Sequence, residues 1–284
     1  MAGQIGSTQR AGALVALRLH DTDVARQLAL KVRGSGELQD ATFFRDYLRE
    51  ADDMVLPAEV AWAAHELVGL SPRSVDKLRW QAVAADQFLA AGDSGSAHQV
   101  LVELVRESEP GEGAHDMALR RLFSLLATNP KSLSEAGRLL ERYRMEYPDS
   151  VRLEAGMTGV LAIGYARAGD LASGEQVLAG ARTRMDRTVF SALDAAAAKL
   201  SLYAGRRDSA IAQARRGLSE DGLDPAEHTS RLHLLTLLQA ADSSEVAVVG
   251  EGTLNLLRDP GRFDLIKSLG ALASIPKTSG RSIA

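Results

Sequence analysis

The sequence predicts an all-α fold, an array of helical hairpins, and three observations lead to that prediction. Aromatic residues make up only 5% of the chain, and prolines number 8. Long stretches rich in Ala, Leu, Arg and Glu carry apolar residues at three- and four-residue spacing, which is the pattern of an amphipathic helix. Gly-Asp pairs interrupt these stretches, and such pairs are suited to ending one helix and starting the next.

Length and composition favour one folded domain. The chain has 284 residues, of which 45% are hydrophobic, so it can bury a continuous core. A helical array can extend this far as one unit because each repeat touches mainly its neighbours. We therefore predict a single domain over residues 1–275, followed by a loose tail over 276–284.

Charge and cysteine usage exclude several classes of function. The 33 basic and 37 acidic residues give a net charge of -4, without the basic footprint of a nucleic-acid or anionic-membrane binder. The absence of cysteine excludes disulfides, thiolate zinc sites and cysteine nucleophiles. No stretch reaches the roughly 18 apolar residues of a membrane span. We expect a cytoplasmic protein, or an envelope protein if an export signal has been removed.

The hairpin unit is clearest in residues 78–107. Leu78, Ala85 and Leu89 recur on one helical face, Gly92-Asp93 forms the turn, and the apolar pattern resumes after it. Two further segments repeat the plan. Their predicted turns are Gly169-Asp170 and Gly205, the second with Asp208 as the start of the following helix.

One second helix carries a small residue, then an apolar residue four later, another three later, and then a proline. Ala136, Leu140, Tyr143 and Pro148 have this spacing, which resembles the tetratricopeptide repeat. The next unit places six residues at the family's positions, with glycine where alanine is usual at 174: Leu161, Tyr165, Gly169, Gly174, Leu178 and Ala181. The resemblance is clearest over residues 73–219, where the family's early tryptophan is missing.

The resemblance implies a right-handed α-solenoid of about seven hairpins with a C-terminal capping helix. The repeat step is longer than the family's roughly 34 residues, because Ala97, Ala136, Gly174 and Ala210 follow one another by 39, 38 and 36 positions. The expected hairpins cover residues 8–33, 37–69, 73–107, 114–147, 150–184, 186–219 and 226–257, with a last helix over 261–273. Small residues should lie where helices approach closely: Ala85, Ala97, Ala136, Ala162, Gly174, Ala198 and Ala210.

No motif for catalysis, metal binding or a cofactor stands out. Residues 92–95 read Gly-Asp-Ser-Gly, as around the nucleophile of chymotrypsin-like proteases, but those enzymes are β-barrels and here the segment joins two helices. The six histidines form no HExxH arrangement, and no phosphate-binding glycine loop appears. Trp62 and Trp80 are expected in the core, with a partner-facing position as the alternative.

The candidate site comes from the family's geometry, in which the first helix of each hairpin lines a concave groove. That geometry implies a series of basic residues on or near the groove: Arg79, Arg121, Arg167, Lys199 and Arg231. Such residues could hold an acidic segment or a carboxylate by charge-assisted hydrogen bonds. The alternative is that they are ordinary solvated side chains. The lysine and asparagine pattern of the family's chaperone-tail clamp is absent.

The leading functional hypothesis is an interaction module or scaffold that binds a peptide or helix of another protein in a concave groove. The alternative is a tetratricopeptide-like sensor or regulatory domain of a bacterial signalling or transcription system. An all-helical enzyme is disfavoured because no convergent polar residues can be identified. The partner's identity and the oligomeric state stay open.

Overall fold

The computed structural model describes residues 2–33, 37–71, 74–218, 232 and 235. Within these ranges the chain forms α-helices and two short 3₁₀ helices and contains no strand, so the all-α prediction is confirmed. The chain divides into two compact units, Met1–Leu125 and Leu126–Ala284. Each unit is described by itself.

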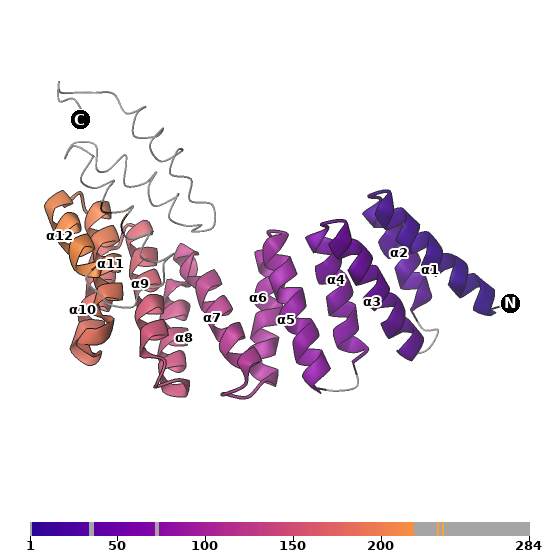
Figure 1. The fold of residues 1–284 in the computed structure, drawn as a ribbon, viewed down its shortest axis with the longest axis horizontal. Coiled ribbons are helices and arrows are strands. Elements are labelled where there is room, and N and C mark those ends of the chain that lie inside the picture. Colours follow the sequence, from indigo (N-terminus) through magenta and orange to yellow (C-terminus); the bar gives the residue numbers. More distant parts are fainter. Residues whose placement is uncertain (1, 34–36, 72–73, 219–231, 233–234, 236–284) are drawn as a thin grey trace, which may run out of the picture. The chain divides into compact units, whose positions relative to one another are not determined.

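The first unit consists of helices joined into hairpins (Figure 1). Within it, α1 packs against α2, α3 against α4 and α5 against α6, and successive hairpins contact each other through α1 and α3 and through α4 and α5. The helices are α1 (Ala2–Arg18), α2 (Thr22–Val32), α3 (Glu37–Asp53), α4 (Pro57–Gly69), α5 (Ser74–Ala90), α6 (Ser94–Glu107) and most of α7 (Gly113–Ala127).

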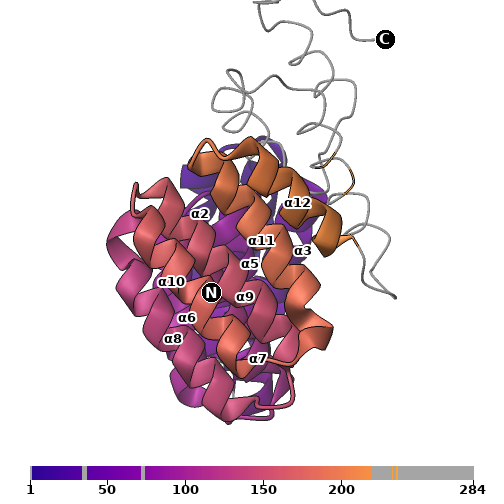
Figure 2. The ribbon, with the colours of Figure 1, turned by 90° about the vertical axis from the view of Figure 1, so that its left-hand side faces the viewer.

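The second unit repeats the hairpin plan, and Figure 2 looks onto it. Helix α9 contacts α8, α10 and α11, while α11 also contacts α12. The elements are η1 (Pro130–Ser132), α8 (Leu133–Glu146), α9 (Val151–Arg167), α10 (Leu171–Arg184), η2 (Arg187–Val189), α11 (Phe190–Tyr203) and α12 (Arg207–Gly217). The 3₁₀ helices were not predicted.

The helix positions agree with the first six predicted hairpins, except that α1 begins at Ala2, before the predicted start at residue 8. The predicted range 37–69, for example, contains α3 and α4, which begin and end at its limits, and 73–107 contains α5 and α6. The predicted hairpin 226–257, the helix 261–273 and the tail 276–284 lie outside the described residues. The solenoid arrangement, its right-handedness and the single domain over 1–275 stay predictions.

Five hairpins share one turn, in which a single residue adopts the left-handed conformation. These residues are His20 (φ 59°), Val55 (φ 56°), Gly92 (φ 78°), Gly169 (φ 86°) and Gly205 (φ 68°). They follow one another by 35 residues from 20 to 55, by 37 from 55 to 92, and by 36 from 169 to 205. The three glycine turns were predicted, because glycine adopts this conformation without strain. The turns at His20 and Val55 carry no such signal.

Each turn is closed by the Schellman pattern of backbone hydrogen bonds. The N–H of Asp93 donates to the carbonyl of Phe88 at 2.9 Å, and that of Asp170 to the carbonyl of Tyr165 at 2.9 Å. The two aspartates then cap the next helix, as predicted, because their carboxylates accept backbone N–H groups three residues later. The prediction for Asp208 was wrong: α12 begins at Arg207, so Asp208 lies within its first turn.

The predicted small residues are all buried. The packing around position 174 also explains why glycine stands there instead of alanine. A Cβ atom at Gly174 would lie 2.8 Å from the carbonyl oxygen of Ala162, which belongs to the neighbouring helix. Gly164 is similar, with 2.7 Å to the carbonyl oxygen of Ala127. Helices in the second unit therefore approach to backbone contact, which no side chain larger than hydrogen permits.

The first unit has an aromatic core instead. Phe44 and Tyr47 are fully buried on α3, and the ring of Trp62 on α4 lies edge-on to both, with centroids 5.6 and 5.3 Å away. Trp62 therefore packs against the core, as predicted, but is only partly buried. Trp80 is partly buried against the same core.

Ion pairs join successive hairpins of the first unit. The arginines come from α1, α2 and the residue after α2, and the acids from α3 and α4. The pairs are Arg10–Asp40, Arg18–Glu50, Arg26–Glu59 and Arg33–Glu66. Glu59 is nearly buried and accepts three bonds, two from Arg26 at 3.0 and 2.8 Å and one from the Tyr47 hydroxyl at 2.8 Å. Burial and the Glu59 hydrogen bond raise the pKa of Tyr47 well above its ordinary value.

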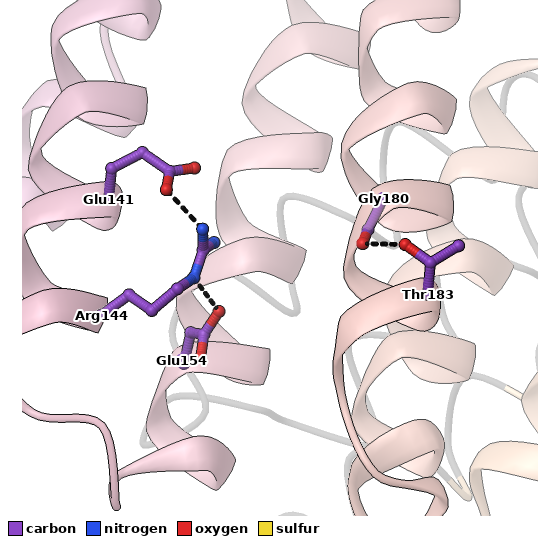
Figure 3. Close-up of polar contacts among 5 residues, drawn as sticks. All are labelled: Glu141, Arg144, Glu154, Gly180 and Thr183. Atoms are coloured by element: carbon purple, nitrogen blue, oxygen red, sulfur yellow. Dashed lines mark hydrogen bonds and ion pairs between the residues drawn. The ribbon is translucent and has the colours of Figure 1, made fainter.

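Ion pairs in the second unit hold the nearly buried acids Glu154 and Asp194. Arg144 of α8 contacts Glu154 of α9 at 2.6 Å and also Glu141 (Figure 3). Figure 3 also shows Thr183, whose hydroxyl donates to the carbonyl of Gly180 within α10 at 2.8 Å.

Candidate functional site

The two predicted site residues in the first unit both have neighbours that engage their charge. Arg79 on α5 is exposed, and its guanidinium carbon lies 5.5 Å from the ring centroid of Trp80, a cation–π contact. Arg121 on α7 forms an ion pair with Asp86 on α5. Partial burial lowers the pKa of Arg121 from its ordinary value, yet an arginine stays cationic at neutral pH. The charge of Arg121 is therefore already paired with that of Asp86.

Two predicted residues of the second unit lie on neighbouring helices, α9 and α11. Arg167 is the last residue of α9, and its Nε donates to the hydroxyl of Tyr203, the last residue of α11, at 3.3 Å. Lys199 lies one helical turn before Tyr203 on α11, so both side chains project from the same face of that helix. Arg231 lies outside the described residues. The five-residue groove as a whole stays a prediction.

These residues stand at one end of an open helical surface, which we name the α9–α11 face. Its members are half-buried or exposed: Leu153, Gly156, Val160 and Arg167 on α9, and Ala192, Ala195, Lys199 and Tyr203 on α11. Leu153 and Val160 are 45% and 43% exposed. The residues recur at three-, four- and seven-residue spacing, so each helix presents one continuous stripe.

Packing on the opposite side explains why the face is open. Ala162 lies against Gly174 of α10, and Ser201 donates to Gln213 of α12 at 2.7 Å. Each stands two residues after a member of the face, Val160 or Lys199, which places it on the other side of its helix. Helices α10 and α12 thus cover the buried side. Gly217 of α12 also packs against the backbone of Ala195, whereas Leu153 and Val160 of α9 stay exposed.

The two stripes form one surface because α9 and α11 touch. A Cβ atom at Gly159 would lie 2.9 Å from the Cβ of Ala196, so the helices meet with little side chain between them. The Arg167–Tyr203 bond joins their C-terminal ends. Small side chains along this line let a partner approach the helix backbones closely.

The acids of α9 and α11 take no part in the face. Glu154 is the single acid of α9 and pairs with Arg144, while Asp194 is the single acid of α11 and contacts Arg182 and Arg216. Both acids are nearly buried. Among the described residues, no carboxylate lies within ion-pair distance of Arg167. The two helices therefore add no acid to the face. Arg167 and Lys199 lie toward its C-terminal end, and exposed Arg152 lies next to Leu153 at the other end.

Sequence reasoning identified Arg167 and Lys199 but missed the apolar part of the face and Tyr203. Leu153, Val160 and Tyr203 are ordinary members of a helical apolar pattern, so the sequence favours a core position for each. The signal available was the stripe itself, since Leu153, Val160 and Arg167 stand seven residues apart, which keeps them on one side of a helix.

No metal centre is indicated in the described part of the chain, because no cluster of three or more His, Asp or Glu side chains lies close enough together there. Among the described helices, none combines the length and the apolar character that crossing a membrane requires.

Comparisons with known proteins add no family. No protein-family model matches the chain, and no curated protein matches its sequence. The fold and the face therefore define only a class, an all-α protein of repeated helical hairpins with an open helical surface.

Proposed function

We propose that this chain is a tetratricopeptide-like interaction module that binds a peptide or helix of another protein on the α9–α11 face. The observation that carries the proposal is the exposure of Leu153 and Val160 on a helix whose opposite side is fully packed. Burying two such side chains under a partner contributes roughly 1–3 kcal/mol each. That contribution is on the scale of a hot spot in an interface.

The hairpin repeat supports this proposal. Two neighbouring first helices, α9 and α11, contribute equivalent stripes, so the face extends across a hairpin boundary. A segment lying along it would contact both helices at once, as in helix-in-groove recognition. The resemblance to tetratricopeptide repeats points the same way, because in that family the first helices line the binding groove.

A random dodecapeptide library displayed on phage tests the proposal without a known partner. The full chain is immobilised, and enriched peptides are measured against Val160→Asp and Val102→Asp. The two valines are matched, at 43% and 40% exposed, but Val102 lies on α6 in the other unit.

We expect Val160→Asp to weaken the enriched peptides by about tenfold or more, since a partner would bury the new charge unpaired. Val102→Asp should bind like the wild type. Circular dichroism should show the same helicity for all three proteins. Failure to enrich any peptide, or equal binding by both variants, would contradict the proposal.

A further inference from the structure

Arg18 and Arg167 occupy the same place in their hairpins. Each stands two residues before the left-handed turn residue, which is His20 after α1 and Gly169 after α9. Each reaches from the first helix of its hairpin to the first helix of the next. What meets the guanidinium differs, because Arg18 finds Glu50 and Arg167 finds Tyr203.

The first unit shows what this arginine position binds. Arg18 donates from Nε and Nη2 to the two carboxylate oxygens of Glu50 at 2.6 and 2.9 Å, a bidentate pair. The Arg18 hydrogen bond lowers the pKa of Glu50, and Glu50 raises that of Arg18. Arg18 lies in the last turn of α1, at the negative end of the helix dipole. Because Glu50 binds there, the dipole does not prevent an arginine at this position from binding a carboxylate.

At Arg167 the corresponding group is a phenol, which leaves hydrogen-bond donors unused by the pair. The Tyr203 hydroxyl accepts from Arg167 Nε at 3.3 Å, so its own proton is directed elsewhere. The guanidinium has further N–H groups besides Nε. Lys199 adds a second cation one turn away on α11.

We propose that Arg167, Tyr203 and Lys199 bind the side-chain carboxylate of a Glu or Asp in the partner segment that lies on the α9–α11 face. The inference rests on the proposed function and names the polar anchor of that partner. The partner's carboxylate takes the role that Glu50 has for Arg18. Glu154 and Asp194 do not compete for the site, because their arginine partners hold them on the packed side of α9 and α11.

The geometry also places the partner's apolar side chains to one side of its acid. The apolar part of the face, from Leu153 to Val160, precedes the cationic end at Arg167 along α9. A partner helix or strand would thus carry apolar side chains followed or preceded by one acid, depending on its direction. Contact with the acid is charge-assisted, so binding should weaken as salt rises.

The same dodecapeptide library tests this inference, with selections run in parallel on wild type, Arg167→Gln and Arg18→Gln. We expect Glu and Asp to be enriched at one position on wild type and on Arg18→Gln. On Arg167→Gln that enrichment should disappear while the apolar preference stays. Arg18→Gln is the matched control, since it removes the arginine at the equivalent position of another hairpin, and that arginine is already paired with Glu50.

Synthetic peptides from the wild-type selection give the affinities. With a blocked C-terminus, an acidic peptide should bind Arg167→Gln about tenfold more weakly than wild type. Replacing its acid by the corresponding amide should remove most of that difference. Tyr203→Phe, which keeps the ring and removes the hydroxyl, should weaken the acidic peptide by a smaller factor and leave the amide peptide unchanged.

The outcomes separate the two proposals. If no peptide is enriched on wild type, both the proposed function and this inference fail. If peptides are enriched and depend on Val160, but carry equal acid content on wild type and Arg167→Gln, only this inference is overturned. Binding that requires a free C-terminal carboxylate would also overturn it, because the source would then be a chain terminus.

Discussion

The two units pack the same kind of hairpin by different means. In the first, large aromatic side chains fill the space between α3 and α4, and arginine–carboxylate pairs join one hairpin to the next. In the second, glycines at 164 and 174 bring helices to backbone contact, and the core contains mainly Ala, Leu, Val and Ile. Hairpin packing therefore does not require one type of contact.

The difference has a consequence for the surface. Side-chain packing in the first unit uses Arg18 to bind Glu50, so the charge at the end of α1 is neutralised internally. In the second unit, α9 and α11 meet where Gly159 faces the methyl group of Ala196, and Arg167 meets a phenol. A unit whose helices are joined by small residues can leave Arg167 without a carboxylate partner.

The largest expected effect comes from the buried acid of the first unit. Glu59→Ala removes the common acceptor of Arg26 and Tyr47 and leaves both without it. We expect a loss of about 3 kcal/mol in the free energy of unfolding, because charge-assisted hydrogen bonds are lost and the buried Tyr47 hydroxyl is left unpaired, while Arg26, 39% exposed, can be hydrated. Glu50→Ala, whose partner Arg18 is 63% exposed, should cost less than about 1 kcal/mol. Similar losses in urea unfolding would contradict the distinction between the two pairs.

The second prediction concerns glycine packing in the second unit. Gly164→Ala would place a methyl 2.7 Å from the carbonyl oxygen of Ala127 and 2.8 Å from Leu133. We expect a destabilisation of about 1–3 kcal/mol from overpacking. Gly156→Ala is the control on the same helix, because nothing lies within 4 Å of its new methyl. It should stabilise by about 0.5–1 kcal/mol through helix propensity.

The two variants should therefore move the urea midpoint in opposite directions. If both stabilise, α9 is not held at backbone distance from its neighbours. The contrast between the units would then be lost.

The third prediction concerns the shared turn. Val55 adopts φ 56° although it is β-branched and 82% exposed, whereas glycine fills the same position in three other hairpins. Val55→Gly should stabilise the first unit by about 1 kcal/mol, because left-handed strain of about 1–2 kcal/mol is relieved at some cost in unfolded-chain entropy. Gly92→Val should destabilise it by about the strain energy. A thermal melt in which Val55→Gly is neutral or harmful would show that the turn is unstrained.

The smallest effect should appear in both units at acid pH. The Ser96 N–H lowers the pKa of Asp93, and the hydroxyl and N–H of Ser173 lower that of Asp170, below the ordinary value of 3.8. The charged caps therefore stabilise the protein above pH 3.8, and this contribution is lost as pH falls through the lowered pKa values. Asp93→Asn and Asp170→Asn should flatten the acid side of the melting-temperature profile by similar amounts. A profile that the substitutions leave unchanged would argue against both caps.

Several features of the fold could be predicted because they depend on neighbours in the chain. The turns at Gly92, Gly169 and Gly205 were predicted, since glycine and the following polar residue define a helix boundary locally. The turns at His20 and Val55 could not be located in the same way, because packing imposes a left-handed conformation that these residues do not favour. Asp208 was misplaced because a capping residue type also occurs within first turns.

In the candidate site, too, the sequence shows the residues but not their partners. The basic residues Arg121 and Arg167 are visible in the sequence and look alike there. Their environments differ, because Asp86 lies beside one and Tyr203 beside the other, and both partners come from more than thirty residues away. No local pattern can assign such partners.

The sequence by itself determined that this protein is helical, where most hairpins begin and end, and which small residues are buried, because helix periodicity and turn chemistry act over a few residues. The tertiary structure decided which side of α9 and α11 stays open and which arginines are already paired. Those outcomes depend on contacts between helices that are distant in the chain, where a shift of one residue turns a side chain by about 100° around its helix.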